Sequence, residues 1–228
     1  TSFQLRPSFN PDELRAICDE VHKFGKHAAA HCINNQGISN AIEAGVDTII
    51  HGYYKDPDGT FSYRPDITER IATQGVFVNP TLHQGLENVW FLEEKAQSKG
   101  LTPEEQRDLE ESHRAHDIRI DHVSRLWTEG VRLVCGSDSA WARYPMGGFQ
   151  KEMNAHVQVG MSPMEAIVSA TSDSARSCWI DGEAGTLEPG KRADLLVVDG
   201  DPSQDIAALS NVADVFQGGV LVDRGNFM

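Results

Sequence analysis

Four short apolar segments, each preceded by a predicted helix that ends in glycine, place the strongest constraint on the fold of this 228-residue chain. The segments are residues 27–31, 46–50, 76–79 and 131–135, and the preceding glycines are Gly25, Gly45, Gly75 and Gly130. A helix that ends in glycine just before an apolar run is typical of βα units. The runs are nearly continuous in apolar residues, which indicates strands covered on both faces. The sequence therefore predicts an α/β protein with a parallel sheet.

The helices predicted before these strands cover residues 10–24, 38–44, 65–73 and 102–128. Further helices are expected at 86–97, 149–159 and 164–170. The C-terminal part differs, because residues 185–198 indicate two short strands around a Pro-Gly turn and residues 220–223 a final strand. Four βα units make either half of an eight-stranded barrel or a small open sheet, and the β-rich tail is a separate appendage.

Composition excludes some classes of partner. The chain has 34 Asp and Glu against 20 Lys and Arg, for a net charge of -14, which argues against binding to nucleic acids and to anionic membrane surfaces. No segment approaches the roughly 20 apolar residues of a membrane span, and no signal peptide is visible. The four cysteines are scattered, as in proteins with reduced thiols. We therefore expect a cytoplasmic protein.

Three potential metal ligands follow predicted strands. His31 ends the first apolar run, His51 ends the second, and Asp138 comes shortly after the fourth. Parallel strands bring their C-terminal ends to one face of the sheet, so these side chains could converge. Imidazoles bind divalent metals, and a carboxylate beside the metal can accept a proton from its bound water. The three residues predict a hydrolytic metal site with Asp138 as both ligand and catalytic base.

Each candidate also has a plain structural interpretation. A histidine at a strand end is usually a satisfied polar residue at the core boundary, and Asp138 could cap a turn. His83 and Tyr53 follow predicted strands and are candidates for substrate binding, although exposed loop positions explain them equally well. Cys32 is expected to be a buried structural thiol. The histidines of the long helix are expected on a solvated face; these are His113, His116 and His122.

Several segments together resemble the amidohydrolase superfamily, especially its imidazolonepropionase and Xaa-Pro dipeptidase-like branch. They are residues 28–31 (AAAH), 50–52 (IHG), 136–138 (GSD), 161–166 (MSPMEA) and 185–198 (GTLEPGKRADLLVV). The last of these, followed by residues 199–202 (DGDP), is the most specific. The resemblance extends over essentially the whole chain.

The resemblance implies a fold and a chemistry. Residues 1–180 would be the C-terminal half of a TIM-type (β/α)8 barrel, containing strands five to eight, and residues 181–228 part of an accessory β-sandwich. His31 and His51 would come from strands five and six, and Asp138 from strand eight. The cofactor would be a divalent metal, with zinc preferred, as one or two ions. The substrate would be a small molecule with an amide or related bond, such as a dipeptide or cyclic amide, and in some members an ester or carbamate.

The sequence also departs from this family. It contains no His-x-His pair, and the lysine that bridges the metals in strand four has no counterpart. Residues 139–141 (SAW) replace the small residues usual after the aspartate. A half-barrel would leave two unpaired sheet edges. We therefore expect an oligomer, and a complementary N-terminal half that is part of the same gene product or a separate chain.

Two alternatives remain at this stage. The chain could be a non-catalytic module of amidohydrolase fold that hydrolyses no substrate by itself. It could also be a mononuclear hydrolase that uses only His31, His51, Asp138 and water, although family members with one metal still use the missing histidine pair.

Overall fold

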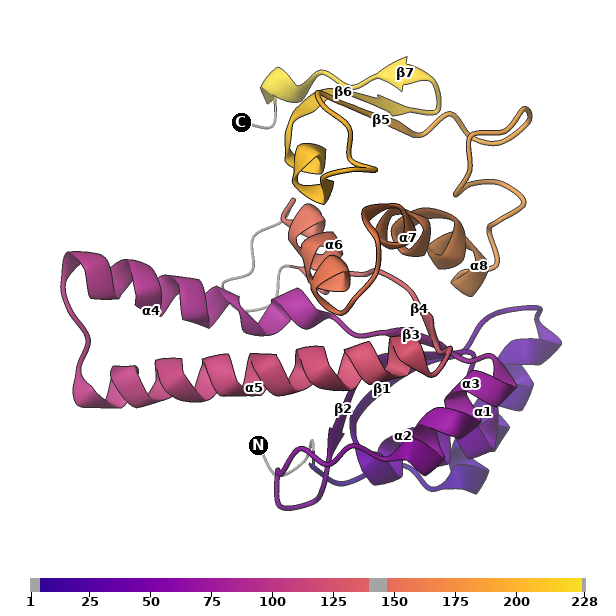
Figure 1. Cartoon of the computed structure of the whole chain (residues 1–228). Helices are drawn as coiled ribbons and strands as arrows, with labels where there is room; N and C mark the ends of the chain where they lie inside the picture. The colour runs from indigo at the N-terminus through magenta and orange to yellow at the C-terminus, as the bar shows by residue number, and fades with distance from the viewer. Residues whose placement is uncertain (1–4, 140–146, 227–228) are drawn as a thin grey trace.

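A four-stranded parallel sheet lies at the centre of the computed structural model, which describes residues 5–139 and 147–226. Its strands are β1 (Ala29–Asn34), β2 (Thr48–Lys55), β3 (Phe77–Asn79) and β4 (Arg132–Leu133), adjacent in chain order. Parallel neighbours that follow one another in sequence require crossover connections, which the helices between them provide. The predicted α/β fold with a parallel sheet is confirmed (Figure 1).

Helices α1 (Pro11–Lys23), α2 (Asn35–Ala44) and α3 (Pro65–Gln74) lie together beside β1 and β2 (Figure 1). Helix α1 starts with a capping box in which Asn10 and Glu13 satisfy each other's backbone N–H groups. Helices α2 and α3 both end at a glycine in the left-handed region, which leads the chain directly into the next strand. The predicted glycine stops are therefore confirmed for these two helices.

Two long helices form a hairpin that projects away from the sheet (Figure 1). A short 3-10 turn (η2, Leu82–Gly85) leads from β3 into α4 (Glu87–Ser98), and α5 (Pro103–Thr128) returns toward β4. The buried side chains of α5 all lie in its last ten residues: Arg119, His122, Val123 and Leu126. The hairpin is therefore anchored at its base, and its outer end is solvated.

The C-terminal part stacks further layers on the sheet. Helices α6 (Phe149–Gln158), α7 (Pro163–Val168) and α8 (Ser174–Ser177), with a π-turn (η3, Ser169–Asp173) before α8, lie between the parallel sheet and a small antiparallel one (Figure 1). The antiparallel sheet contains β5 (Leu195–Val198), β6 (Val212–Gln217) and β7 (Val220–Leu221), in that order. Two 3-10 turns belong to this part of the chain: η4 (Ile206–Ser210) lies between β5 and β6, and η5 (Arg224–Asn226) follows β7.

Two sequence-based expectations about these elements are wrong, and one strand was not predicted. Residues 185–198 contain one strand, β5, because residues 185–194 form turns; β6 was not predicted. The first two strands also extend beyond the predicted ends, so His31 and His51 lie inside β1 and β2. They continue because Cys32 pairs with His51 and Asn34 with Lys55, which keeps residues past the histidines in the sheet.

Nothing in the fold tests the barrel numbering. That β1–β4 are strands five to eight of a barrel, that β5–β7 belong to a sandwich, and that the chain divides at residue 180 all stay predictions. Within residues 5–139 and 147–226, no helix is both long and apolar enough to cross a membrane.

Candidate functional site

The rings of His31 and His51 lie against each other. Their centroids are 4.6 Å apart, with the ring planes at 80°. In the β1–β2 register His31 is level with Ile50, so a regular strand would direct the next residue, His51, to the opposite face. His51 instead has φ of +71°, a conformation rare for residues other than glycine. This break in the strand lets the two imidazoles meet.

The orientation of the His51 ring is fixed by the turn that follows the neighbouring strand β3. Its Nδ1 lies 2.6 Å from the hydroxyl oxygen of Thr81, in a buried hydrogen bond. Burial, and then the charges of His31 and Arg119, lower the pKa of His51 to about 4. The imidazole is therefore neutral near pH 7, which is the form that ligates metals. The bond at Nδ1 leaves Nε2 as the nitrogen that could take a metal.

Asp138 belongs to a second group of polar side chains. Its Oδ2 accepts a hydrogen bond of 2.7 Å from the amide nitrogen of Gln84. The amide oxygen of Gln84 accepts a bond of 3.2 Å from the Tyr53 hydroxyl, and the Tyr53 ring lies 5.4 Å from the His51 ring. Tyr53, predicted to bind substrate, is thus close to the His51 ring and is linked to Asp138 through Gln84. The polar chain from Tyr53 to Asp138 connects the two parts of the candidate site.

The metal ligands that the sequence predicts are assembled only in part. Among residues 5–139 and 147–226, no three His, Cys, Asp or Glu side chains converge as a group that could hold a metal ion. His31 and His51 fit half of a donor set, because two neutral imidazoles suit a borderline divalent metal. Asp138 is held by Gln84 and does not complete a group with them. The metal roles of His31, His51 and Asp138 stay predictions.

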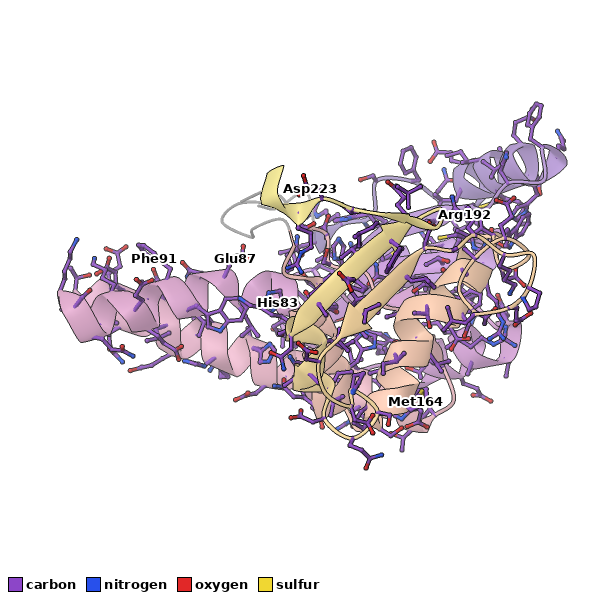
Figure 2. All side chains as sticks on the ribbon, turned by 90° about the horizontal axis from the view of Figure 1, so that it is seen from above. His83, Glu87, Phe91, Met164, Arg192 and Asp223 are labelled. Carbon is purple, nitrogen blue, oxygen red and sulfur yellow. The ribbon has the colours of Figure 1, made fainter. Side chains whose placement is uncertain are left out.

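His83 lies in the interior. The residue is 1% exposed, and its ring lies 4.5 Å from that of Trp90. Burial lowers the pKa of His83 to about 4. His83, Glu87 and Phe91 follow one another outward along the helical hairpin, with His83 at its base (Figure 2). Its predicted contact with substrate is not tested by this position and stays a prediction.

The remaining candidates have structural surroundings. His122 is buried and its ring lies 5.3 Å from that of Tyr63, so the prediction of a solvated face is wrong for this residue. His113, by contrast, is exposed beside Glu93. Cys32 is buried, and burial raises its pKa to about 12, which confirms a structural thiol. Of the unusual segment at 139–141, Ala140 and Trp141 lie outside the described residues.

Sequence reasoning missed four residues that surround the site: Thr81, Gln84, Arg119 and Glu152. Thr81 and Gln84 follow β3 in the segment 79–84 (NPTLHQ), whose proline marks the end of the strand. Arg119 and Glu152 look like ordinary charged residues of solvated helices. No local pattern separates them from their exposed neighbours, since their burial depends on which helix faces the sheet.

Comparison with known proteins identifies the family. The model of the amidohydrolase family matches residues 3–222. The chain belongs to the amidohydrolase family. It superimposes on a crystal structure of a Xaa-Pro dipeptidase with bound methionine at a TM-score of 0.76 and 30% identity, covering 96% of this chain and 50% of that one. The amidohydrolase superfamily resemblance, including its Xaa-Pro dipeptidase-like branch, is confirmed.

Two further relatives support this assignment. The ochratoxinase of Aspergillus niger is 26% identical over 218 residues, covering 93% of this chain and 41% of the relative. Its crystal structure superimposes with a TM-score of 0.72, covering 96% of this chain and 46% of that chain. An uncharacterized protein of Mycobacterium tuberculosis (strain ATCC 25618 / H37Rv) is 28% identical over 207 residues, covering 91% of this chain and 50% of the relative. This amidohydrolase chain spans about half the length of the curated relatives it matches.

Proposed function

We propose that this chain supplies half of the active site of a metal-dependent amidohydrolase that cleaves an amide or related C–N bond. The observation that carries the proposal is the contact between the His31 and His51 rings, 4.6 Å apart on adjacent parallel strands. The substrate would be a small molecule such as a dipeptide or a cyclic amide, with an ester or carbamate as further options. Family membership and the likeness to a Xaa-Pro dipeptidase and an ochratoxinase support this class of reaction.

The chemistry assigns a role to each predicted residue. A divalent metal, with zinc preferred and one or two ions in the complete site, would lower the pKa of a bound water to about 7. His31 and His51 would hold it through neutral imidazoles. Asp138 would take the proton of the hydrolytic water and return it to the leaving nitrogen. Tyr53 and His83 would contact the substrate.

The other half of the barrel would join at β1, which is an edge of the described sheet. A cavity of about 500 Å³ runs along this strand and is lined mainly by apolar residues of α1, β1 and α2. An unpaired edge beside an apolar cavity suits the addition of another strand. The complementary half would belong to the same polypeptide or to a separate chain, and would bring the remaining ligands. The completed protein would be a cytoplasmic TIM-barrel enzyme, present as an oligomer.

Replacing the predicted proton carrier tests the proposal. In the full-length protein, or in the complex with its complementary half, we expect Asp138→Asn to lower turnover by about a hundredfold or more. Asp19→Asn on the exposed face of α1 is the matched control and should leave turnover unchanged. Retention of full turnover by Asp138→Asn would contradict the proposed role.

A non-catalytic module is the second candidate, and one observation favours it: the described residues contain no complete three-ligand group. Elemental analysis of the purified protein, together with identification of any co-purifying chain, separates the two functions. Stoichiometric metal with a complementary half supports the enzyme. A metal-free homo-oligomer supports the module.

A further inference from the structure

One turn contacts both parts of the candidate site. It consists of Thr81 and the first residues of η2, directly after β3. At one end the Thr81 hydroxyl bonds to Nδ1 of His51, and at the other the Gln84 amide donates to Asp138. The distance between the imidazole and the carboxylate therefore depends on the conformation of the turn 81–84.

The backbone of this turn is strained at its first residue. Thr81 has φ of +46°, a left-handed conformation that a β-branched residue rarely adopts. Such a conformation persists only where surrounding contacts hold it, and it is concentrated at functional sites. Two buried charged residues from different helices provide contacts of this kind.

Arg119 of α5 holds the carbonyl side of the turn. It is 6% exposed, and its Nη2 donates to the carbonyl oxygens of Pro80 and Thr81 at 2.8 Å each. The guanidinium carbon also lies 4.1 Å from the centroid of the Tyr53 ring, and the Tyr53 hydroxyl donates to Gln84. Arg119 thus contacts Thr81, which bonds to His51. It also contacts Tyr53, which is linked to Asp138 through Gln84.

Glu152 of α6 holds the N–H side of the same turn. Its side chain is fully buried, and its two oxygens accept the backbone N–H groups of Leu82 at 2.7 Å and His83 at 2.6 Å. Burial alone would raise the pKa of Glu152, but His156 and these two N–H groups hold it below its usual value. A buried carboxylate kept charged in this way binds backbone donors strongly.

We propose that Arg119 and Glu152 are positioning residues that fix the turn 81–84, so that Thr81 orients His51 and Gln84 orients Asp138. The inference rests on the proposed function, because it gives those two residues their chemical meaning. It adds that one rigid turn, held by residues of α5 and α6, sets the positions of both His51 and Asp138. The Nδ1–H tautomer of His51, donating to Thr81, would leave the Nε2 lone pair for the metal.

The first test reads the His51 ring directly, by ¹⁵N NMR of the metal-free full-length protein. We expect the Nδ1–H tautomer in the wild type and in Thr81→Ser, and a mixture of tautomers in Thr81→Val, which loses the hydroxyl. Arg119→Lys and Glu152→Gln should change the same signals. Arg114→Lys and Glu94→Gln, at exposed helix positions, are the matched controls and should leave them unchanged.

The second test measures metal affinity and turnover of the same variants with Zn²⁺. Loss of a partner that orients a ligand typically lowers either quantity by about 10- to 100-fold, and we expect this for Arg119→Lys, Glu152→Gln and Thr81→Val, with KM little changed and Thr81→Ser close to wild type. If the variants of the buried charges do not fold, Gln84→Met removes the bond to Asp138 near the surface and should lower kcat by a similar factor.

The outcomes separate the two proposals. Folded Arg119→Lys and Glu152→Gln proteins with wild-type ring signals and turnover overturn the positioning role. If those proteins do not fold, wild-type behaviour of Thr81→Val and Gln84→Met overturns it instead. If Asp138→Asn keeps full turnover while the ring signals still respond to Thr81→Val, the proposed function fails and the coupling of turn and ring stands.

Discussion

The apolar residues of the two sheets differ in their exposure to solvent. In the parallel sheet Ile49, Val78 and Leu133 are almost fully buried. In the antiparallel sheet Leu196 and Val197 are 48% and 42% exposed, and Val220 is 70% exposed. Leu196 and Val197 are consecutive, so they point to opposite faces, and solvent reaches both. The middle of the parallel sheet thus belongs to the packed core, whereas among the described residues the antiparallel sheet lacks a full cover on either face.

This difference shows which apolar strand residues stay in contact with solvent. Contiguous apolar surface on a soluble protein usually marks an interaction site. If β5–β7 are part of an accessory sandwich, as the resemblance implies, the remaining strands of that sandwich would cover them. The candidate site, by contrast, lies on the parallel sheet, whose two edges, β1 and β4, are where the rest of a barrel would join.

The largest expected effect is on the packed sheet. Ile49→Ala in the middle of β2 should lower the free energy of unfolding by about 2–5 kcal/mol, because it leaves a cavity in a fully buried position. Val220→Ala in β7 removes methyl groups that are mostly exposed and should cost less than about 0.5 kcal/mol. Urea unfolding of the full-length protein measures both values. Equal costs would show that β7 is covered in the complete protein and would remove the contrast.

A second expected effect is a loss of stability at acidic pH. All nine histidines lie at or before residue 156, so none belongs to the antiparallel sheet. The pKa of His83 is about 4 in the folded protein and about 6.5 when unfolded, so the unfolded state binds the proton first as the pH falls. The resulting stability is present above pH 6.5 and is lost as the pH falls to about 4. The pKa difference corresponds to about 3 kcal/mol.

His83→Gln tests this effect, with the exposed His113→Gln as its control. Between pH 6.5 and pH 4, the loss of unfolding free energy should be smaller in His83→Gln than in the wild type, and unchanged in His113→Gln. Chemical denaturation at several pH values provides the measurement. An identical pH dependence of all three proteins would show that the pKa of His83 is the same in the folded and unfolded states.

The smallest effect on folding is expected at the exposed strand. Val220→Thr keeps the shape of the side chain and adds a hydroxyl at a position that is mostly in water, so the unfolding free energy should change by less than about 0.5 kcal/mol. If copies of the protein associate through the antiparallel sheet, the same change should weaken that association. Sedimentation over a range of protein concentrations measures it. Unchanged association would place the contact surface elsewhere.

Several parts of the fold and site follow from local sequence patterns. Asn10 with Glu13 predicts the start of α1, and Gly45 and Gly75 predict the ends of α2 and α3, because these signals act within a few residues. β6 was missed because its sequence, VADVFQ, lacks a regular alternation of apolar and polar residues. It becomes a strand by pairing with β5 and β7, and its sequence contains no sign of those partners.

The sequence by itself determined the parallel βα units and the family, and it singled out His31 and His51 as candidates, since apolar runs, glycine stops and family motifs are local. Tertiary structure decided how that pair is held. The positive φ of His51, the strained Thr81 and the buried charges of Arg119 and Glu152 exist only because β2, β3, α5 and α6 meet at one turn. A charged residue on a helix is buried or solvated according to what packs against it, and that depends on elements distant in the chain.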